Sequence, residues 1–225
     1  TRRSSDLQVF SRIGSIWLQN FINRLHKASY DFVANNTRDR IANLLAKWVT
    51  PDQIFYVDHH SCHAASVYYG MVADRNKEIL VFTLDGYGDF LSATVSVATG
   101  ARIKRISATP MAHSIGNMYG KTTQFLGMKE NEHEYKVMGL APYSKDYYKD
   151  AYERIFKGVI YREQDELEFK SIIDTQYFKQ YLESCAVGER FDNIAAALQI
   201  CTEDLITDWI RTAIRKTGIS TICTA

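Results

Sequence analysis

The sequence has few cysteines and prolines, almost no net charge and no long apolar run. Its four cysteines form no CxxC pair, which argues against a zinc ribbon and for reduced thiols, and we therefore predict a cytoplasmic location. Twenty-seven basic against 26 acidic residues leave a net charge of +1, which offers no basic field for nucleic acid. No stretch reaches the roughly 18 consecutive apolar residues that a membrane span requires. We therefore expect neither a nucleic-acid nor a membrane partner.

The composition is that of a globular chain, with 46% hydrophobic, 12% aromatic and 24% charged residues among 225. This length is long for one average domain and short for two. The chain begins at Thr1 and ends soon after Ile219–Cys223, a run typical of a buried strand. We therefore expect a fragment whose sheet is incomplete at both ends and whose open strand edge favours a homodimer.

Hydrophobic periodicity predicts an α/β chain with a mixed sheet. Helices are expected near the start, followed by a strand and a helix, a three-strand antiparallel meander, further helices and a last strand. In chain order the predicted segments are helices 10–25 and 37–48, strand 54–57, helix 58–73, strands 79–84, 91–97 and 102–107, glycine-interrupted helices within 114–140, a hairpin of 159–162 with 167–170, helix 192–216 and strand 219–223.

Three of the six histidines fall in the segment Asp58-His59-His60-Ser61-Cys62-His63. In a helix, His59 and His63 are four residues apart and project from one face. Two imidazoles at this spacing can share a divalent metal ion. The alternative is that these histidines pack against or cap a helix start. The glutamate of the helical zinc-protease motif is missing, which argues against a peptidase.

A second segment, Leu84-Asp85-Gly86-Tyr87-Gly88-Asp89, lies between two predicted strands. The two glycines, Gly86 and Gly88, let the backbone turn tightly and bring amide groups close to a phosphate. Asp85, at the strand end, is placed to hold a metal ion beside that phosphate. An ordinary hairpin turn explains the same residues equally well.

The third group of candidates follows the meander. Gly116, near a helix start, allows an anion to approach free amide groups. Lys136 offers a point charge for phosphate, and Glu134 offers hydrogen-bond acceptors for a ribose. No Walker lysine pattern is present. Each of these residues, taken separately, is also explained by a loop whose polar groups are satisfied internally.

Read together, DHHSCHAAS, LDGYGD, SIGNMYGKTTQFLG and EYKVMGLAPY resemble the NodU/CmcH carbamoyltransferases, which modify nodulation factors and antibiotics. The resemblance extends from about Ile54 to Ala225. It implies an actin/hexokinase/Hsp70-like (ribonuclease H-like) fold, in which a mixed sheet carries flanking helices. Residues 1–78 would then belong to the first actin-like subdomain and residues 79–225 to a truncated second one.

The resemblance also implies an ATP-dependent O-carbamoyltransferase. Such enzymes join carbamoyl phosphate and ATP into carbamoyladenylate on a separate domain, and the actin-like domain passes the carbamoyl group to a hydroxyl of a sugar or antibiotic-like acceptor. His59, His63 and Asp85 match the positions that hold a metal ion, commonly iron, with zinc as the alternative. The residues that match or neighbour the nucleotide-binding segments are Gly86, Tyr87, Gly88, Gly116, Glu134, Lys136 and Gly139.

The family pattern places its general base before Thr1 and another metal-binding aspartate after Ala225. We therefore expect the isolated chain to be inactive, and the sequence identifies no catalytic residue. Two alternatives stay open. One is a non-catalytic nucleotide- or metal-binding module, and the other is a tRNA threonylcarbamoyl transferase or hydrogenase-maturation relative. The latter would normally carry paired CxxC segments, which this sequence lacks.

Overall fold

The computed structural model describes residues 35–225, so the helix predicted for residues 10–25 lies outside the described residues. The chain divides into two compact units, one ending at Val57 and the other spanning Asp58–Ala225. In the described part of the first unit, residues 35–45 are helical and a short 3-10 turn, η1 (Pro51–Gln53), follows.

The strand predicted for residues 54–57 is not formed. Residues 54–58 adopt no regular secondary structure, and the Phe55 side chain is 84% exposed. Tyr56 instead donates its hydroxyl hydrogen to the Arg38 carbonyl, and the Arg38 guanidinium lies over the tyrosine ring. A short apolar run has strand propensity but becomes a strand only where a neighbouring strand accepts its backbone hydrogen bonds.

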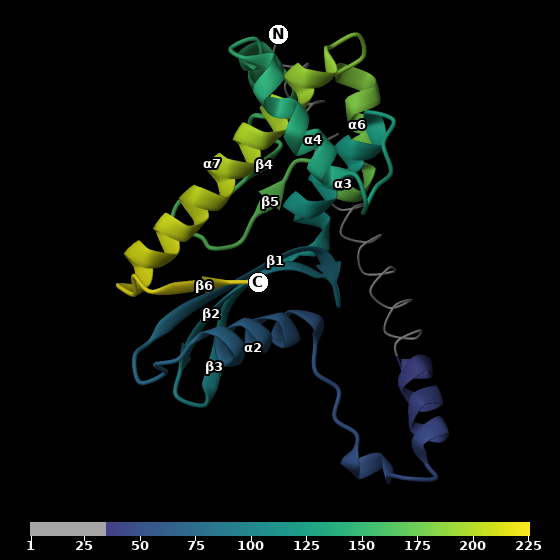
Figure 1. Cartoon of the computed structure of the whole chain (residues 1–225), viewed down its shortest axis with the longest axis vertical. Helices are drawn as coiled ribbons and strands as arrows, with labels where there is room; N and C mark the ends of the chain where they lie inside the picture. The colour runs from purple at the N-terminus through teal and green to yellow at the C-terminus, as the bar shows by residue number, and fades with distance from the viewer. Residues whose placement is uncertain (1–34) are drawn as a thin grey trace, which may run out of the picture. The chain divides into compact units, whose positions relative to one another are not determined.

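The second unit is a mixed α/β arrangement in which α2 covers one face of a sheet and α7 covers the other (Figure 1). Its strands are β1 (Ile79–Gly88), β2 (Leu91–Thr99), β3 (Arg102–Pro110), β4 (Ile160–Tyr161), β5 (Lys170–Ser171) and β6 (Ile222–Thr224). Its helices are α2 (His59–Met71), α3 (Ile115–Phe125), α4 (Glu134–Leu140), α5 (Tyr148–Ala151), α6 (Phe178–Cys185) and α7 (Phe191–Thr217), with single turns η2 (Met111–His113), η3 (Ala141–Ser144), η4 (Tyr152–Phe156) and η5 (Thr175–Tyr177).

The main sheet has the strand order β3-β2-β1-β6. The first three strands form an antiparallel meander, and β6 pairs with β1 in parallel, with Leu80 opposite Ile222 and Phe82 opposite Thr224. The predicted meander, mixed sheet and long C-terminal helix are confirmed. The actin-like arrangement and the division at residue 78 remain predictions.

The residues of β1 alternate between two hydrophobic clusters, because successive side chains of a strand point to opposite faces of the sheet. Leu80 and Phe82 belong to the larger cluster, on the face that α7 covers. Ile79 and Val81 belong to the smaller cluster, where Tyr68 of α2 is fully buried. The sheet is therefore covered on both faces, and the position of α2 against it is set by close packing.

Trp209 of α7 joins the helix to the sheet. Its ring centroid lies 4.9 Å from that of Phe82 and 5.1 Å from that of Phe169. Its indole N–H donates to the carbonyl of Leu167 over 2.8 Å, so the polar atom of this buried ring is satisfied.

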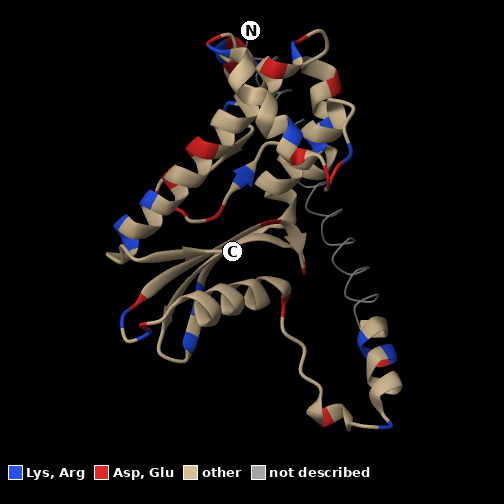
Figure 2. Cartoon of the chain, viewed as in Figure 1, with Lys and Arg blue, Asp and Glu red and all other residues tan. Residues whose placement is uncertain are grey.

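Charged side chains of both signs are interspersed along the helices of the second unit in the view of Figure 2. Lysine and arginine gather toward the C-terminal end of α7, where Arg215 forms an ion pair with Asp165. This placement is favourable because the helix dipole is negative at that end. Within residues 35–225, none of the helices combines the length and the apolar character needed to cross a membrane.

Replacing the buried indole should be costly. We expect Trp209→Ala to lower the free energy of unfolding by about 3–5 kcal/mol, because a cavity forms and the Leu167 carbonyl loses its donor. Urea denaturation followed by circular dichroism measures this loss. Trp48→Ala is the matched control, since Trp48 is 76% exposed. A loss below about 1 kcal/mol for Trp209→Ala would contradict the packing described.

Candidate metal centre and adjoining cavity

Helix α2 begins at His59 because Asp58 caps its N-terminus. One oxygen of Asp58, Oδ1, accepts a hydrogen bond from the Ser61 backbone N–H over 3.1 Å. The same oxygen forms an ion pair with Arg105 of β3 over 2.6 Å. Burial by itself would raise the pKa of the Asp58 carboxyl, but the hydrogen bonds from Ser61 and Arg105 outweigh it and hold the pKa below its ordinary value. Asp58 is therefore an ionised cap, tied to the sheet through Arg105.

The β1–β2 turn provides a second anchor for the same helix end. Asp89 and Phe90 form the two-residue turn between the paired residues Gly88 and Leu91, and both have left-handed backbone angles, with φ of 49° and 66°. That conformation costs a residue other than glycine about 1–2 kcal/mol. Asp89 Oδ2 accepts the His59 backbone N–H over 2.7 Å. The strained turn is thus held by contact with α2.

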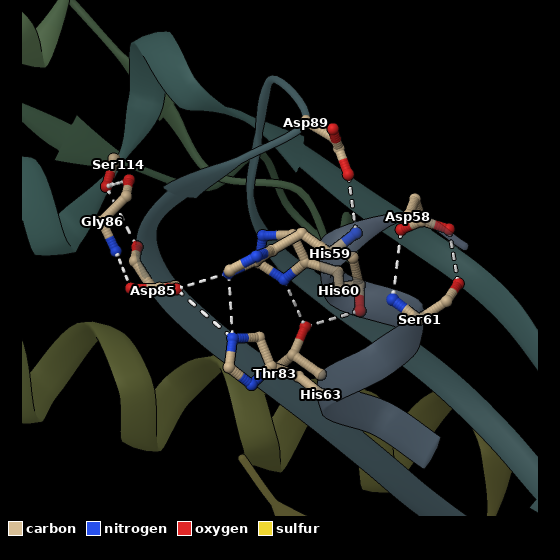
Figure 3. Close-up of polar contacts among 11 residues, drawn as sticks. Asp58, His59, His60, Ser61, His63, Thr83, Asp85, Gly86, Asp89 and Ser114 are labelled. Carbon is tan, nitrogen blue, oxygen red and sulfur yellow. Dashed lines mark hydrogen bonds and ion pairs between the residues drawn. The ribbon is translucent and has the colours of Figure 1, made fainter. Parts of the chain in front are cut away.

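Three side chains converge beside this helix end. His59 Nε2 lies 2.8 Å from Asp85 Oδ2, His63 Nε2 lies 3.4 Å from the same oxygen, and the two imidazole Nε2 atoms are 2.9 Å apart. Figure 3 shows the two rings and the carboxylate pointing toward one another, the histidines from α2 and the aspartate from β1. The structure thus brings together the three residues that the sequence suggested as metal ligands.

The separations of these three atoms fit a shared metal ion. Two ligand atoms that each lie roughly 2.0–2.2 Å from one ion, about 90–110° apart, are themselves about 2.8–3.6 Å apart. The observed 2.8, 2.9 and 3.4 Å fall within that range. Two imidazole nitrogens and one carboxylate oxygen are also a donor set that suits iron and zinc.

Asp85 is held from the side opposite the histidines. Its Oδ1 accepts the backbone N–H of Gly86 over 2.6 Å. Burial acts to raise the pKa of the Asp85 carboxyl, but the hydrogen bonds from His59 and Gly86 outweigh it, so the pKa lies below its usual value. The carboxylate is therefore charged near neutral pH, as a metal ligand must be.

Two glycines permit this close packing. A Cβ on Gly88 would lie 2.2 Å from the ring of His59, so Gly88 contacts the imidazole directly. A Cβ on Gly116 would lie 2.8 Å from the backbone of Asp85 and Gly86. Ser114, the N-cap of α3, donates its hydroxyl hydrogen to the Gly86 carbonyl over 2.6 Å. The start of α3 thus packs on the backbone that carries Asp85.

His60 is not a member of this cluster, although its ring lies edge-on to that of His59, with the ring centroids 5.5 Å apart. Its ring is fully buried, and Nδ1 lies 2.7 Å from the Thr83 hydroxyl, which in turn lies 2.7 Å from the Thr94 hydroxyl. Burial lowers the pKa of His60, which favours the neutral ring. Of the three histidines, His60 fits the alternative reading of a packed core histidine.

A polar cavity of about 580 Å³ adjoins the cluster, with Asp85 in its wall. Gly86 and Tyr87, both suggested by the sequence, line this cavity. Asn117 and Lys121 of α3 line it too, four residues apart. The remaining lining residues are Glu130, Asn131, Gln176, Tyr177 and Gln180.

The candidates on α4 are not among these lining residues. Glu134 accepts the Asn131 backbone N–H over 2.7 Å, and the Lys136 ammonium lies over the ring of Tyr135. A Cβ on Gly139 would meet no atom within 4 Å. The cation of the cavity wall is Lys121, which sequence reasoning missed. Its spacing of four residues from Asn117, on one helix that starts beside Gly86, was the available signal.

The fold and the site define a mixed α/β domain with a candidate metal centre at the edge of a polar cavity. The chain belongs to the carbamoyltransferase N-terminus family, whose model matches residues 7–225. This match confirms the resemblance to the carbamoyltransferase family and extends it from about Ile54 back to residue 7.

Curated relatives agree with this membership. The chain is 34% identical to Nodulation protein NolNO of Sinorhizobium fredii over 54% of its length, and 27% identical to Nodulation protein NolO of Bradyrhizobium diazoefficiens over 75%. It is 29% identical over 85% of its length to an uncharacterized protein of Methanocaldococcus jannaschii. The matched parts cover 18%, 30% and 34% of these three relatives.

The contact between Gly88 and His59 predicts an asymmetry between two glycines. Gly88→Ala should displace the His59 ring and lower the free energy of unfolding by about 1–3 kcal/mol, as overpacking does. Urea denaturation and the NMR signals of the histidine rings measure both effects. Gly70→Ala, in α2, is the control, because a Cβ there meets nothing within 4 Å and alanine favours a helix. Equal behaviour of the two variants would refute the close approach at Gly88.

Proposed function

We propose that this chain is the actin-like domain of an ATP-dependent O-carbamoyltransferase, which moves a carbamoyl group from carbamoyladenylate to a hydroxyl of a small-molecule acceptor. The observation that carries the proposal is that Asp85 belongs both to the cluster with His59 and His63 and to the wall of the polar cavity. Such a site holds a metal ion next to a bound substrate. Family membership supports the carbamoyl group as the transferred unit.

In this proposal His59, His63 and Asp85 hold a divalent ion, iron or alternatively zinc. When bound, the ion supplies Lewis acidity, which polarises a substrate oxygen and stabilises negative charge. The two histidines stay in place because Asp58 and Asp89 fix the first turn of α2, while the Gly86 N–H orients Asp85. The protein thus orients the ligands through backbone contacts that do not depend on the ion.

The cavity would receive the adenylate. Gly86 and Tyr87 present backbone and aromatic surface, and Lys121 presents a positive charge for phosphate. In the described part of the chain, the charged residues that line the cavity are Asp85, Glu130 and Lys121, whose formal charges sum to −1. A divalent ion on Asp85 changes that sum to +1. An anionic nucleotide is therefore repelled by the metal-free cavity and attracted by the metal-loaded one.

The acceptor would be a sugar or antibiotic-like hydroxyl compound, which is the class that the resemblance to the NodU/CmcH carbamoyltransferases implies. Carbamoyl phosphate and ATP would be the other substrates. The chain spans at most 34% of the three relatives named above, so the whole reaction is proposed for the parent enzyme. A non-catalytic metal- and nucleotide-binding module is the second candidate. It shares the same site but predicts no transfer in any context.

The metal site is tested by removing its imidazoles. The double variant His59→Ala with His63→Ala should lose at least about tenfold in affinity for zinc or iron, because two of three ligands are gone. Equilibrium dialysis with elemental analysis measures the bound metal. His133→Ala is the control, since His133 Nδ1 accepts only a local N–H, that of Lys129. Unchanged metal affinity in the double variant would contradict the proposed metal site.

The charge argument predicts coupling between metal and nucleotide. Calorimetric titration of AMP into the metal-loaded chain should show binding that weakens at least about tenfold after chelation, and AMP should tighten metal binding by the same factor. Equal AMP affinity with and without metal would contradict the site.

We expect no transfer when ATP, carbamoyl phosphate, iron and sugar acceptors are supplied to this chain. Turnover at an ordinary enzymatic rate would place the catalytic base within this chain.

A further inference from the structure

Lys121 and Glu130 form an ion pair in the cavity wall. The Lys121 ammonium lies 2.8 Å from each oxygen of the Glu130 carboxylate. The two side chains are only 23% and 22% exposed. The pair is therefore partly desolvated, and neither charge is fully screened by water.

Glu130 reaches Lys121 from the loop between α3 and α4. Its side chain lies against Gly120, where a Cβ would come within 3.2 Å of it, so the absence of a side chain at position 120 makes room for the carboxylate. The next residue, Asn131, has a left-handed φ of 65° and donates its backbone N–H to Glu134 at the start of α4. Glu130 thus forms its ion pair with Lys121 from a loop whose next residue is hydrogen-bonded to the start of α4.

Within residues 35–225, Lys121 is the one cationic side chain that lines this cavity. A phosphate group that enters the cavity would need the same ammonium, because lysine binds carboxylate and phosphate through the same charge-assisted hydrogen bonds. While Glu130 holds Lys121, that end of the cavity carries no net charge. A phosphate gains little there unless the carboxylate moves away.

We propose that Glu130 is an internal competitor for the phosphate of the ligand, and that Lys121 exchanges the Glu130 carboxylate for that phosphate when a phosphate-bearing ligand binds. This inference rests on the proposed function, since it assumes that the cavity takes a nucleotide. It adds that the affinity for a phosphate-bearing ligand depends on competition between the ligand phosphate and the Glu130 carboxylate for Lys121. Ligands with phosphate displace the loop residue, whereas uncharged ligands leave the pair intact.

The exchange predicts opposite effects for the two members of the pair. In metal-loaded protein, Glu130→Gln should tighten AMP binding by about fivefold or more, because the ammonium is released from its partner. Lys121→Ala should weaken it by about tenfold or more, since the phosphate loses its cation and faces the Glu130 carboxylate alone. Calorimetric titration of each variant with AMP, and with adenosine as a ligand without phosphate, measures these changes. Adenosine affinity should stay the same in Glu130→Gln.

Glu132→Gln is the matched control. It removes one negative charge from the same loop, but Glu132 pairs with the exposed Lys129 and does not line the cavity. It should leave AMP affinity within about twofold of the original. A Glu130→Gln variant that binds AMP no more tightly than the unaltered chain would overturn the exchange. If Glu132→Gln tightened AMP binding as much as Glu130→Gln, the tightening would be a general effect of removing negative charge, and the exchange would be overturned as well.

The outcomes also separate this inference from the proposed function. If the metal-loaded chain and all variants fail to bind AMP, the nucleotide site itself is wrong and the exchange falls with it. If the unaltered chain binds AMP in a metal-dependent way but Glu130→Gln and Lys121→Ala weaken binding alike, the pair is a structural support of the site. In that case only the exchange is rejected.

Discussion

The contact between the first turn of α2 and the β1–β2 turn constrains the candidate site. Gly88 lies against the ring of His59, and the next residue, Asp89, accepts the His59 backbone N–H. The left-handed angles of Asp89 and Phe90 are unfavourable by themselves and persist because tertiary contacts hold them. Helix and turn therefore determine each other. The position of the imidazole follows from backbone geometry.

Packing sets the rotation of α2 about its axis. His60, Ala64 and Tyr68, spaced four residues apart, form the buried stripe of the helix against the sheet. His59 and His63 form the neighbouring stripe, which the same rotation directs at Asp85. The hydrophobic cluster that contains Tyr68 and the buried hydrogen bond between His60 and Thr83 thus set the direction in which His59 and His63 project.

Charge in the cavity is balanced by local pairing. Asp85 interacts with the two histidines, and Glu130 interacts with Lys121, so each carboxylate that lines the cavity has its own partner. A partly desolvated charge is costly without such a partner. The same pairing makes the cavity responsive, because a ligand or ion that takes one partner changes the field felt by the other. Under the proposed function, metal binding at Asp85 and phosphate binding at Lys121 would therefore be linked through electrostatics.

The sequence by itself determined the features that depend on neighbouring residues. Short segments contain the alternation of apolar and polar residues over β1, β2 and β3 and the spacing of His59 and His63 on one helix. They also contain the motifs that resemble the carbamoyltransferase family. Tertiary structure decided the rest. His59 meets Asp85 across 26 residues, Lys121 rather than Lys136 lines the cavity, and the apolar run at 54–57 forms no strand. Periodicity encodes which face of an element is apolar, but the meeting of distant side chains depends on how packed elements are rotated and on which strands find partners.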